Sequence, residues 1–140
     1  MKIFAIGLNY EAHNREMKRS FEAEEPVVFM KPDTALLRNG NPFFYPDFSQ
    51  EIHYETELVV KISRLGKSIE EKFAHRYYDE VTVGIDFTAR DIQLKQKQLG
   101  LPWEVAKAFD NSAPIGEFVS KHEFGDINNI NVRLDINGES

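Results

Sequence analysis

Hydrophobic and polar residues alternate strictly from Glu51 to Ile62. One side of the pattern carries uncharged residues, and the other side carries Glu51, His53, Glu55, Glu57, Val59 and Lys61. A period of two over this length is typical of a β-strand with one buried face. Because residues i and i+2 of a strand point the same way, we expect Glu55 and Glu57 to project side by side, roughly 7 Å apart at their Cα atoms.

Similar patterns predict the other elements. Strands are indicated at 2–6, 26–30, 80–87, 118–119 and 130–136. The strand at 26–30 is expected to be buried, because it is apolar throughout. A capping box at Ser68 predicts a helix with an apolar stripe that packs into the core. Thr88 is expected to cap a second helix, which ends at Leu99 before Gly100. On the 80–87 strand, Asp86 lies on the face opposite to the apolar residues.

The length of 140 residues predicts one domain with a sizeable core. The last predicted strand is followed by Asn137-Gly138, the leading signal for a two-residue hairpin turn. The strand that would return from this turn is missing from the sequence. We therefore expect residues 1–140 to form a single catalytic-type domain that is truncated at its C-terminal end.

Composition narrows the functional classes. The formal net charge of −6 and the pI of about 5.2 argue against a nucleic-acid-binding surface. The absence of cysteine excludes disulfides, thiol nucleophiles and thiolate metal sites. No apolar run approaches the length of a membrane span, and the first residues lack a signal-peptide pattern. These features favour a cytoplasmic protein that binds small molecules or cations.

Two groups of polar residues are candidates for chemistry. Glu55 and Glu57 would repel each other by about 2.5 kcal/mol at an effective dielectric constant near 20, and a hard divalent cation would reverse this. The alternative is a solvated strand face without a ligand. If the segment after Gly7 is helical, His13 and Glu16 lie at i and i+3, and the glutamate can orient the histidine as a general base. Residues 11–25 are rich in charge, so we expect a lid that is mobile until substrate binds.

Six short motifs follow one another along nearly the whole chain. They are Gly7-Leu8-Asn9-Tyr10 with His13 and Glu16, Phe29-Met30-Lys31-Pro32, Tyr54-Glu55 with Glu57-Leu58, Gly84-Ile85-Asp86 with Thr88-Ala89-Arg90-Asp91 and Gln93, Ala106-Lys107 with Phe109-Asp110, and Asn137-Gly138-Glu139. In this order the chain resembles the fumarylacetoacetate hydrolase family, most closely its small single-domain branch of acylpyruvate hydrolases and oxaloacetate decarboxylases. The resemblance implies a mainly β (α+β) fold of rolled mixed β-sheets with few short helices, and a homodimer.

The resemblance also implies a metal-dependent enzyme. The metal, Mg2+ or Mn2+, would be bound by Glu55, Glu57 and Asp86. The implied catalytic residues are His13, Glu16 and Lys107, and the implied substrate-binding residues are Arg90, Gln93 and Lys31. The first implied function is hydrolysis of a C–C bond in an acylpyruvate or related diketo acid, with the metal as Lewis acid for the leaving enolate. The alternatives are an oxaloacetate-type decarboxylase or a 2-hydroxyhepta-2,4-diene-1,7-dioate isomerase-like enzyme on the same metal site, and a non-catalytic β-domain.

Overall fold

The computed structural model describes residues 1–9 and 26–139. Its strands are β1 (Ile3–Gly7), β2 (Val27–Lys31), β3 (Leu36–Leu37), β4 (Ile52–Ile62), β5 (Tyr78–Ala89), β6 (Ala113–Pro114) and β7 (Val119–Ser120). Its helical segments are η1 (Asp33–Ala35), η2 (Glu71–Arg76), α2 (Arg90–Leu99), α3 (Glu104–Lys107), η3 (Lys121–Glu123) and η4 (Ile127–Asn129). No described helix is long and apolar enough to cross a membrane.

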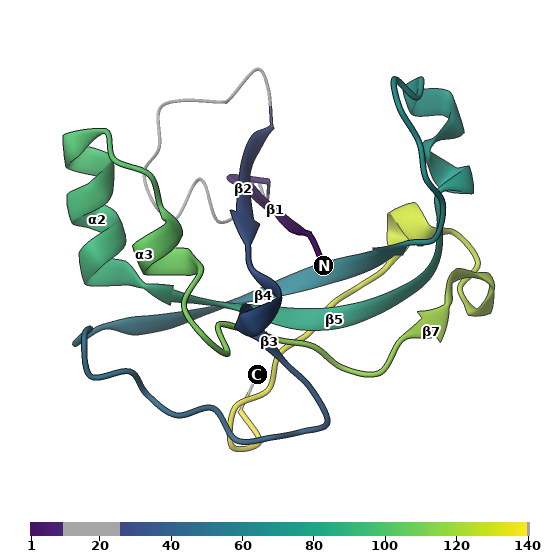
Figure 1. Cartoon of the computed structure of the whole chain (residues 1–140). Coiled ribbons are helices and arrows are strands. Elements are labelled where there is room, and N and C mark those ends of the chain that lie inside the picture. Colours follow the sequence, from purple (N-terminus) through teal and green to yellow (C-terminus); the bar gives the residue numbers. More distant parts are fainter. Residues whose placement is uncertain (10–25, 140) are drawn as a thin grey trace.

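The framework of the fold is the long antiparallel hairpin of β4 and β5 (Figure 1). The strict alternation between Ile52 and Ile62 correctly predicted β4, and the pairing with β5 stays in register until a shift between Lys61 and Ile62. On its other edge β5 pairs with the short strand β7, which completes a three-stranded antiparallel sheet. The hairpin is therefore long enough to carry a functional site at one end and a projecting loop at the other.

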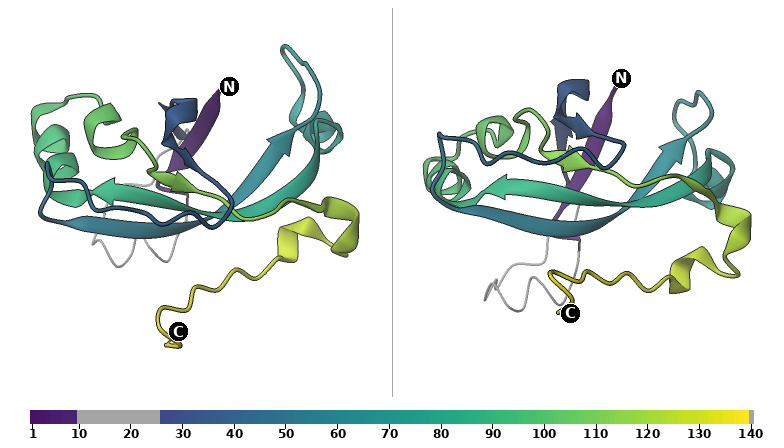
Figure 2. Two further views of the ribbon diagram at one scale, coloured as in Figure 1. Left: turned by 60° about the horizontal axis from the view of Figure 1, so that its bottom comes forward. Right: turned by 90° about the horizontal axis from the view of Figure 1, so that it is seen from below.

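Two smaller sheets lie beside this hairpin. In one of them β1 and β2 are antiparallel, and in the other β3 and β6 are parallel, although they come from distant parts of the chain. Together with the α2–α3 pair, these elements lie on one face of the hairpin (Figures 1 and 2). Beyond β7, the chain runs back along the opposite face (Figure 2). Small parallel and antiparallel sheets with few short helices confirm the predicted fold class.

Local signals correctly located α2 and its end but not its first residue. Gly100 has a φ of 65°, a left-handed conformation that ends a helix at little steric cost. Thr88 does not cap α2, as the sequence had predicted. It is fully buried at the end of β5, its hydroxyl donates to the carbonyl of Asp86 at 3.3 Å, and the cap residue is Ala89. The strand continues through Thr88 because it remains paired with β4 there.

Three further expectations were wrong. The capping box at Ser68 opens no helix, because Ser68 has a φ of 54°, and the 3-10 helix η2 that follows buries no residue. The 26–30 strand forms, but it is only half-buried, since Val28 and Met30 are 55% and 43% exposed. Residues 130–135 form no strand. The Asn137-Gly138 turn does form, and Ile136 and Glu139 bridge across it with two backbone hydrogen bonds.

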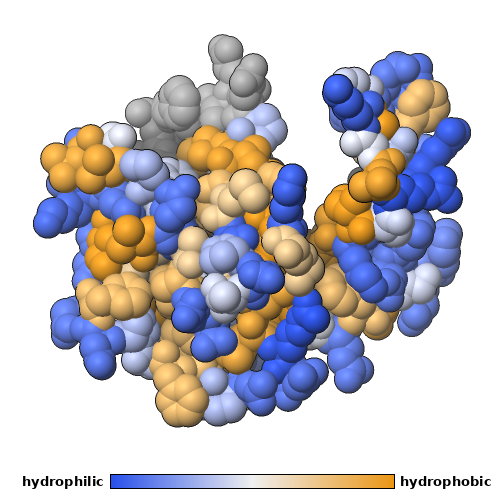
Figure 3. All heavy atoms as spheres, viewed as in Figure 1, coloured by the Kyte–Doolittle hydropathy of each residue, from blue (hydrophilic) through white to orange (hydrophobic). Residues whose placement is uncertain are grey.

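The interior is small and unusually polar. Its buried apolar residues are Ala35, Leu37, Val81, Ala89, Ala106 and Ala113. The buried polar and charged residues of the described chain outnumber these, and they include both an aspartate and several cations. Figure 3 shows apolar side chains on the surface over the β1–β2 sheet and over α2 and α3. Buried charge costs free energy unless it is paired, so the polar interior marks the place where a function would be found.

Candidate functional site

Strand pairing brings two of the predicted metal ligands together. Glu55 on β4 lies directly opposite Asp86 on β5, and Glu57 lies opposite Gly84. Directly opposed residues of an antiparallel pair project from the same face, so the three carboxylates share one side of the hairpin. Asp86 is 6% exposed, whereas the side chain of Glu55 is 22% exposed.

Gly84 keeps this face of β5 free of side chains next to Glu57. A Cβ atom at Gly84 would lie 2.9 Å from a methyl carbon of Val59 and 3.1 Å from the carbonyl oxygen of Pro114. The segment after β6 therefore passes against the bare backbone of β5, where Gly84 and Ile115 form an isolated bridge. This close approach explains a glycine inside a strand.

Lys107 connects the two opposed carboxylates. Its Nζ donates to Glu55 Oε2 and to Asp86 Oδ2, at 2.7 Å in each case. Lys107 is the last residue of α3 and only 2% exposed, and α3 packs against both β5 and α2. A cation between two carboxylates offsets their mutual repulsion, so Lys107 stabilises an arrangement that would otherwise be unfavourable.

Arg90 holds Glu55 from the other side. Arg90 is the first residue of α2 and 4% exposed, and its guanidinium contacts Glu55, the Gln93 amide oxygen at 2.5 Å and His53 Nδ1 at 3.2 Å. Burial acts to raise the pKa of Glu55, but the charge of Lys107 and the hydrogen bonds from Lys107 and Arg90 lower it to about 2. The Glu55 carboxylate is therefore held ionised and in a fixed orientation.

Lys31 lies behind Asp86. Its Nζ is 2.8 Å from Asp86 Oδ1 and 3.0 Å from the hydroxyl of Ser112, and it also donates to the backbone carbonyl of Lys107. Burial lowers the pKa of Lys31 against the opposing effect of Asp86. Lys31 does not belong to the described lining of the cavity. Its contacts with Asp86 and Ser112 therefore support a role in positioning Asp86. The predicted contact of Lys31 with substrate stays a prediction.

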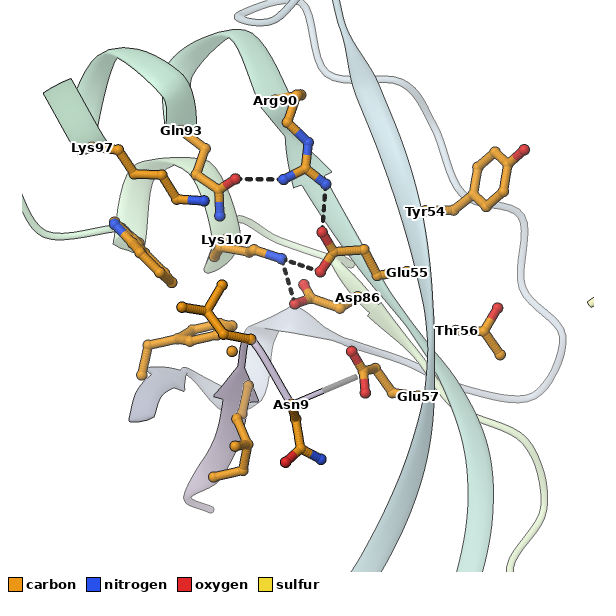
Figure 4. A pocket seen from close by; sticks show the side chains of 16 residues that line it. Asn9, Tyr54, Glu55, Thr56, Glu57, Asp86, Arg90, Gln93, Lys97 and Lys107 are labelled. Carbon is orange, nitrogen blue, oxygen red and sulfur yellow. Dashed lines mark hydrogen bonds and ion pairs between the residues drawn. The ribbon is translucent and has the colours of Figure 1, made fainter. Parts of the chain in front are cut away.

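A cavity of about 260 Å³ opens above these carboxylates. It is lined by Glu55, Glu57, Asp86, Arg90, Gln93, Lys107, Lys97, Tyr54, Thr56, Phe29, Trp103 and residues 5–9. Figure 4 shows α2 directing Gln93 and Lys97 toward the side chains of β4 and β5. The cavity therefore joins an ionic wall on the hairpin to an aromatic wall made by Phe29 and Trp103, whose ring centroids are 5.8 Å apart.

The comparison with known proteins identifies the family. A family model described as fumarylacetoacetate (FAA) hydrolase C-terminal matches residues 2–140. The chain belongs to the fumarylacetoacetate hydrolase family. Among solved members of this fold, a fumarylpyruvate hydrolase from Pseudomonas aeruginosa in complex with Mn2+ and pyruvate is 37% identical, with a TM-score of 0.78. That match covers 88% of this chain and 55% of the Pseudomonas chain.

Curated relatives carry names that describe oxaloacetate chemistry. An oxaloacetate tautomerase of Escherichia coli is 41% identical over 99% of this chain and 63% of its own length. A mitochondrial oxaloacetate tautomerase of Rattus norvegicus is 39% identical over 98% of this chain and 62% of its own length. A mitochondrial oxaloacetate decarboxylase of Dictyostelium discoideum is 36% identical over 99% and 63%, respectively. The chain thus spans just over three fifths of the length of these relatives.

The predicted divalent metal would need oxygen donors that face one another across the cavity. Glu55, Glu57 and Asp86 offer only carboxylate oxygens, which suit a hard divalent cation, and all three line one cavity. Lys107 lies between two of them, and no three acidic or histidine side chains within 1–9 and 26–139 are grouped so as to hold a metal. The three carboxylates therefore fit the ion in donor type and lie on one face, but their side chains are not gathered around one point in this structure, and their assignment as ligands stays a prediction.

Two groups of predictions have different outcomes. The predicted dyad of His13 and Glu16, and the predicted lid at 11–25, lie outside the described residues. The structure brings Arg90, Gln93 and Lys107 to the cavity, and their predicted roles in substrate binding and catalysis stay predictions. Sequence reasoning missed Lys97, although Arg90, Gln93 and Lys97 follow the helical spacing i, i+3, i+7. It also missed Trp103 as part of the wall, for which no local signal exists.

Proposed function

We propose that the protein is a divalent-metal-dependent enzyme that acts on the enol form of a 2-oxo acid, with interconversion of the oxaloacetate tautomers as its first activity. The observation that carries this proposal is the opposed pair of Glu55 and Asp86 at the cavity wall, bridged by the buried Lys107. The names of the E. coli and rat relatives support oxaloacetate as the substrate.

The charges at this end of the cavity support an anionic enolate as ligand. Among the described residues in and directly behind this wall, three carboxylates are accompanied by three cations, so the formal charge of these six side chains is zero: Glu55, Glu57 and Asp86 with Lys31, Arg90 and Lys107. A divalent cation would make the group doubly positive. The carboxylate and the enolate oxygen of an enolised 2-oxo acid carry two negative charges and would restore neutrality, which is favourable in a partly buried site.

The residues at the cavity would have separate roles in metal binding, positioning and charge stabilisation. Glu55, Glu57 and Asp86 would hold the metal, which supplies a Lewis acid for the oxygens of the 2-oxo acid. Arg90 fixes the carboxylate of Glu55, and Lys31 fixes that of Asp86. Lys107 places an ammonium beside both carboxylates, where it stabilises the negative charge that develops when the enolate forms. An aromatic wall beside this charge would lower the local polarity and so strengthen its electrostatic stabilisation.

A second candidate is C–C bond hydrolysis of an acylpyruvate. The observation that favours it is the likeness to the fumarylpyruvate hydrolase of Pseudomonas aeruginosa at 37% identity. Both reactions pass through an enolate, so the described site suits either of them. Hydrolysis also needs a positioned water, and the predicted dyad of His13 and Glu16 would supply it.

The test is a three-way assay on the intact protein with Mg2+. Enol–keto interconversion of oxaloacetate, its decarboxylation and the cleavage of fumarylpyruvate are measured side by side. We expect interconversion to be the fastest reaction. Glu55→Gln and Asp86→Asn should each reduce it by on the order of 100-fold or more and weaken Mg2+ binding, which is measured separately by calorimetry.

Glu80→Gln is the matched control, because Glu80 lies on the same strand as Asp86 but in a surface ion pair. This variant should keep both activity and Mg2+ affinity. Faster cleavage of fumarylpyruvate than tautomer interconversion would favour the hydrolase. If the intact protein accelerates none of the three reactions, or keeps full activity in Asp86→Asn, the proposed enzyme function is wrong.

A further inference from the structure

His53 on β4 projects from the same face as Glu55 and contacts Arg90. Residues i and i+2 of a strand point the same way, so the histidine ring and the Glu55 carboxylate are neighbours along β4. His53 pairs across the hairpin with Thr88, two residues before Arg90. The backbone N–H of Arg90 donates to the carbonyl of Glu51 at 2.8 Å. The start of β4 and the start of α2 are therefore held against each other.

Asp91 strengthens this junction. Its Oδ1 accepts from the hydroxyl of Ser49 at 2.6 Å, and its Oδ2 accepts from the backbone N–H of Gln50 at 3.1 Å. These contacts tie the residues before β4 to the first turn of α2. Because the two backbones are fixed here, the direction of the Arg90 guanidinium depends on what its side chain contacts.

Three acceptors surround the guanidinium of Arg90. Nη2 contacts Glu55 Oε1, Nη1 donates to the Gln93 amide oxygen at 2.5 Å, and Nε donates to His53 Nδ1 at 3.2 Å. Figure 4 shows the first two of these contacts at the cavity. A guanidinium is planar, and its N–H groups form a rigid fork. An acceptor at Nε, in addition to those at the two Nη atoms, therefore fixes both the plane of the group and its rotation.

The contacts of His53 define the role of each ring nitrogen. An arginine side chain can only donate, so Nδ1 of His53 must accept from Arg90. Nε2 lies 2.8 Å from Glu51 Oε1 and donates its hydrogen to that carboxylate. A hydrogen on Nδ1 as well would turn two N–H groups toward each other. Glu51 thus orients the ring with its accepting nitrogen toward Arg90.

We propose that His53, oriented by Glu51, is a positioning residue that fixes the Arg90 guanidinium and, through it, the Glu55 carboxylate for a divalent cation. The proposal rests on the proposed function, in which Glu55 is a ligand of that cation. The alternative is a surface ion pair between His53 and Glu51 without effect on Arg90, since the two side chains are 47% and 50% exposed.

Two substitutions of nearly equal shape separate these interpretations. His53→Asn keeps an acceptor, because its amide oxygen is attached to Cγ, as Nδ1 is in histidine. His53→Leu has no acceptor at this position. Both variants lose the ring nitrogen that contacts Glu51. A difference between them therefore reports the hydrogen bond to Arg90.

The first measurement follows the Nε–H group of Arg90 by 1H–15N NMR on the intact, metal-free protein. The signal is assigned by its absence in Arg90→Lys. Arg90 is 4% exposed, and a buried, hydrogen-bonded N–H exchanges slowly with water. We expect a slowly exchanging signal in the wild type and in His53→Asn, and fast exchange in His53→Leu.

The second measurement is the Mg2+ dissociation constant, obtained by calorimetry. We expect His53→Leu to weaken Mg2+ binding by about 10-fold, the lower end of the effect of residues that orient metal ligands. His53→Asn should stay within about threefold of the wild type, because the acceptor remains. His75→Leu is the matched control: it replaces an exposed histidine of η2, in the projecting loop, and should change neither measurement.

The assignment of His53 is wrong if the Arg90 Nε–H group of the wild type exchanges as fast as in His53→Leu, or if His53→Leu binds Mg2+ as tightly as the wild type. It is also wrong if His53→Asn loses as much affinity as His53→Leu, since the ring alone would then matter and not its accepting nitrogen. Failure of the proposed function gives a different result. The wild type would then bind no Mg2+, although the Arg90 signal would still differ between the two variants, and the role of His53 toward a metal would be refuted.

Discussion

The two ends of the β4–β5 hairpin carry the same kind of ion pair in different surroundings. At one end Lys107 contacts Glu55, with side-chain exposures of 3% and 22%. At the other end Lys61 contacts Glu80, with exposures of 53% and 39%. The first pair lies under α2 and α3, whereas the second lies near the loop that projects away from the rest of the molecule (Figure 1).

This difference determines how much each ion pair contributes to the free energy of unfolding. Charges near the surface are hydrated and screened, so their pairing changes the free energy of unfolding very little. Charges in the interior are costly to bury, and each depends on its partner. The buried pair is kept because the arrangement of Glu55 and Asp86 needs a cation between them. We therefore expect mutations at the buried end to affect both stability and function.

The largest effect is expected for Lys107→Met. Removing this ammonium leaves Glu55 and Asp86 opposed without the cation that bridges them, which should lower the free energy of unfolding by about 3–5 kcal/mol. Urea unfolding followed by circular dichroism and by the fluorescence of Trp103, the single tryptophan, measures this loss. Saturating Mg2+ should restore part of it, because a metal bound only by the folded state stabilises that state.

Lys61→Met applies the same substitution to the exposed end and serves as its control. It should change the free energy of unfolding by less than about 0.5 kcal/mol. If Lys61→Met and Lys107→Met lowered the free energy of unfolding equally, burial would not explain the difference between the two ion pairs. That result would contradict the contrast drawn between the two ends of the hairpin.

The second effect is the pH dependence that Glu55 imposes. Its pKa is lowered from 4.5 to about 2 by Lys107 and Arg90 acting against burial. A carboxyl group whose pKa is depressed on folding stabilises the folded state above its unfolded pKa. The contribution, about 3 kcal/mol, should therefore be present above pH 4.5 and be lost as the pH falls toward 2.

Glu55→Gln isolates this contribution. Over the same acidic range, the free energy of unfolding of the variant should fall by about 3 kcal/mol less than that of the wild type. Urea unfolding at a series of pH values provides the two curves. Parallel curves would show that Glu55 has an ordinary pKa in the folded protein, and would contradict the tight contacts with Lys107 and Arg90.

Local patterns predicted those parts of the fold that depend on local physics. Alternation predicted β4 and β5, and Gly100 correctly predicted the end of α2. The failures have tertiary causes. Thr88 looked like a helix cap, but pairing with β4 keeps it in the strand. The stripe that begins at Ile69 looked like a core helix, but within the described part of the chain η2 lies in the projecting loop between β4 and β5 and buries no residue.

The candidate site could be predicted only in part, because its contacts are distant in sequence. The phase of each strand indicated the faces of Glu55 and Asp86, but only the register of β4 against β5 makes them direct neighbours. Lys107 is 52 residues from Glu55, and only the family resemblance pointed to it. The burial of Lys31 under Asp86 depends on how β2 meets α3, which no pattern in the sequence encodes.

The smallest effect expected is the coupling between Lys61 and Glu80 at the exposed end. A double-mutant cycle with Lys61→Met and Glu80→Gln should give a coupling energy below about 0.5 kcal/mol, and added salt should reduce it further. The Lys61 ammonium also lies 5.3 Å from the ring centroid of Phe118, a contact that does not involve Glu80. The single substitutions can therefore have small effects of their own that the cycle subtracts. A coupling above about 2 kcal/mol, unchanged by salt, would show that this end is as shielded from water as the cavity. The contrast between the two ends of the hairpin would then have to come from the second carboxylate beside Lys107, and not from burial.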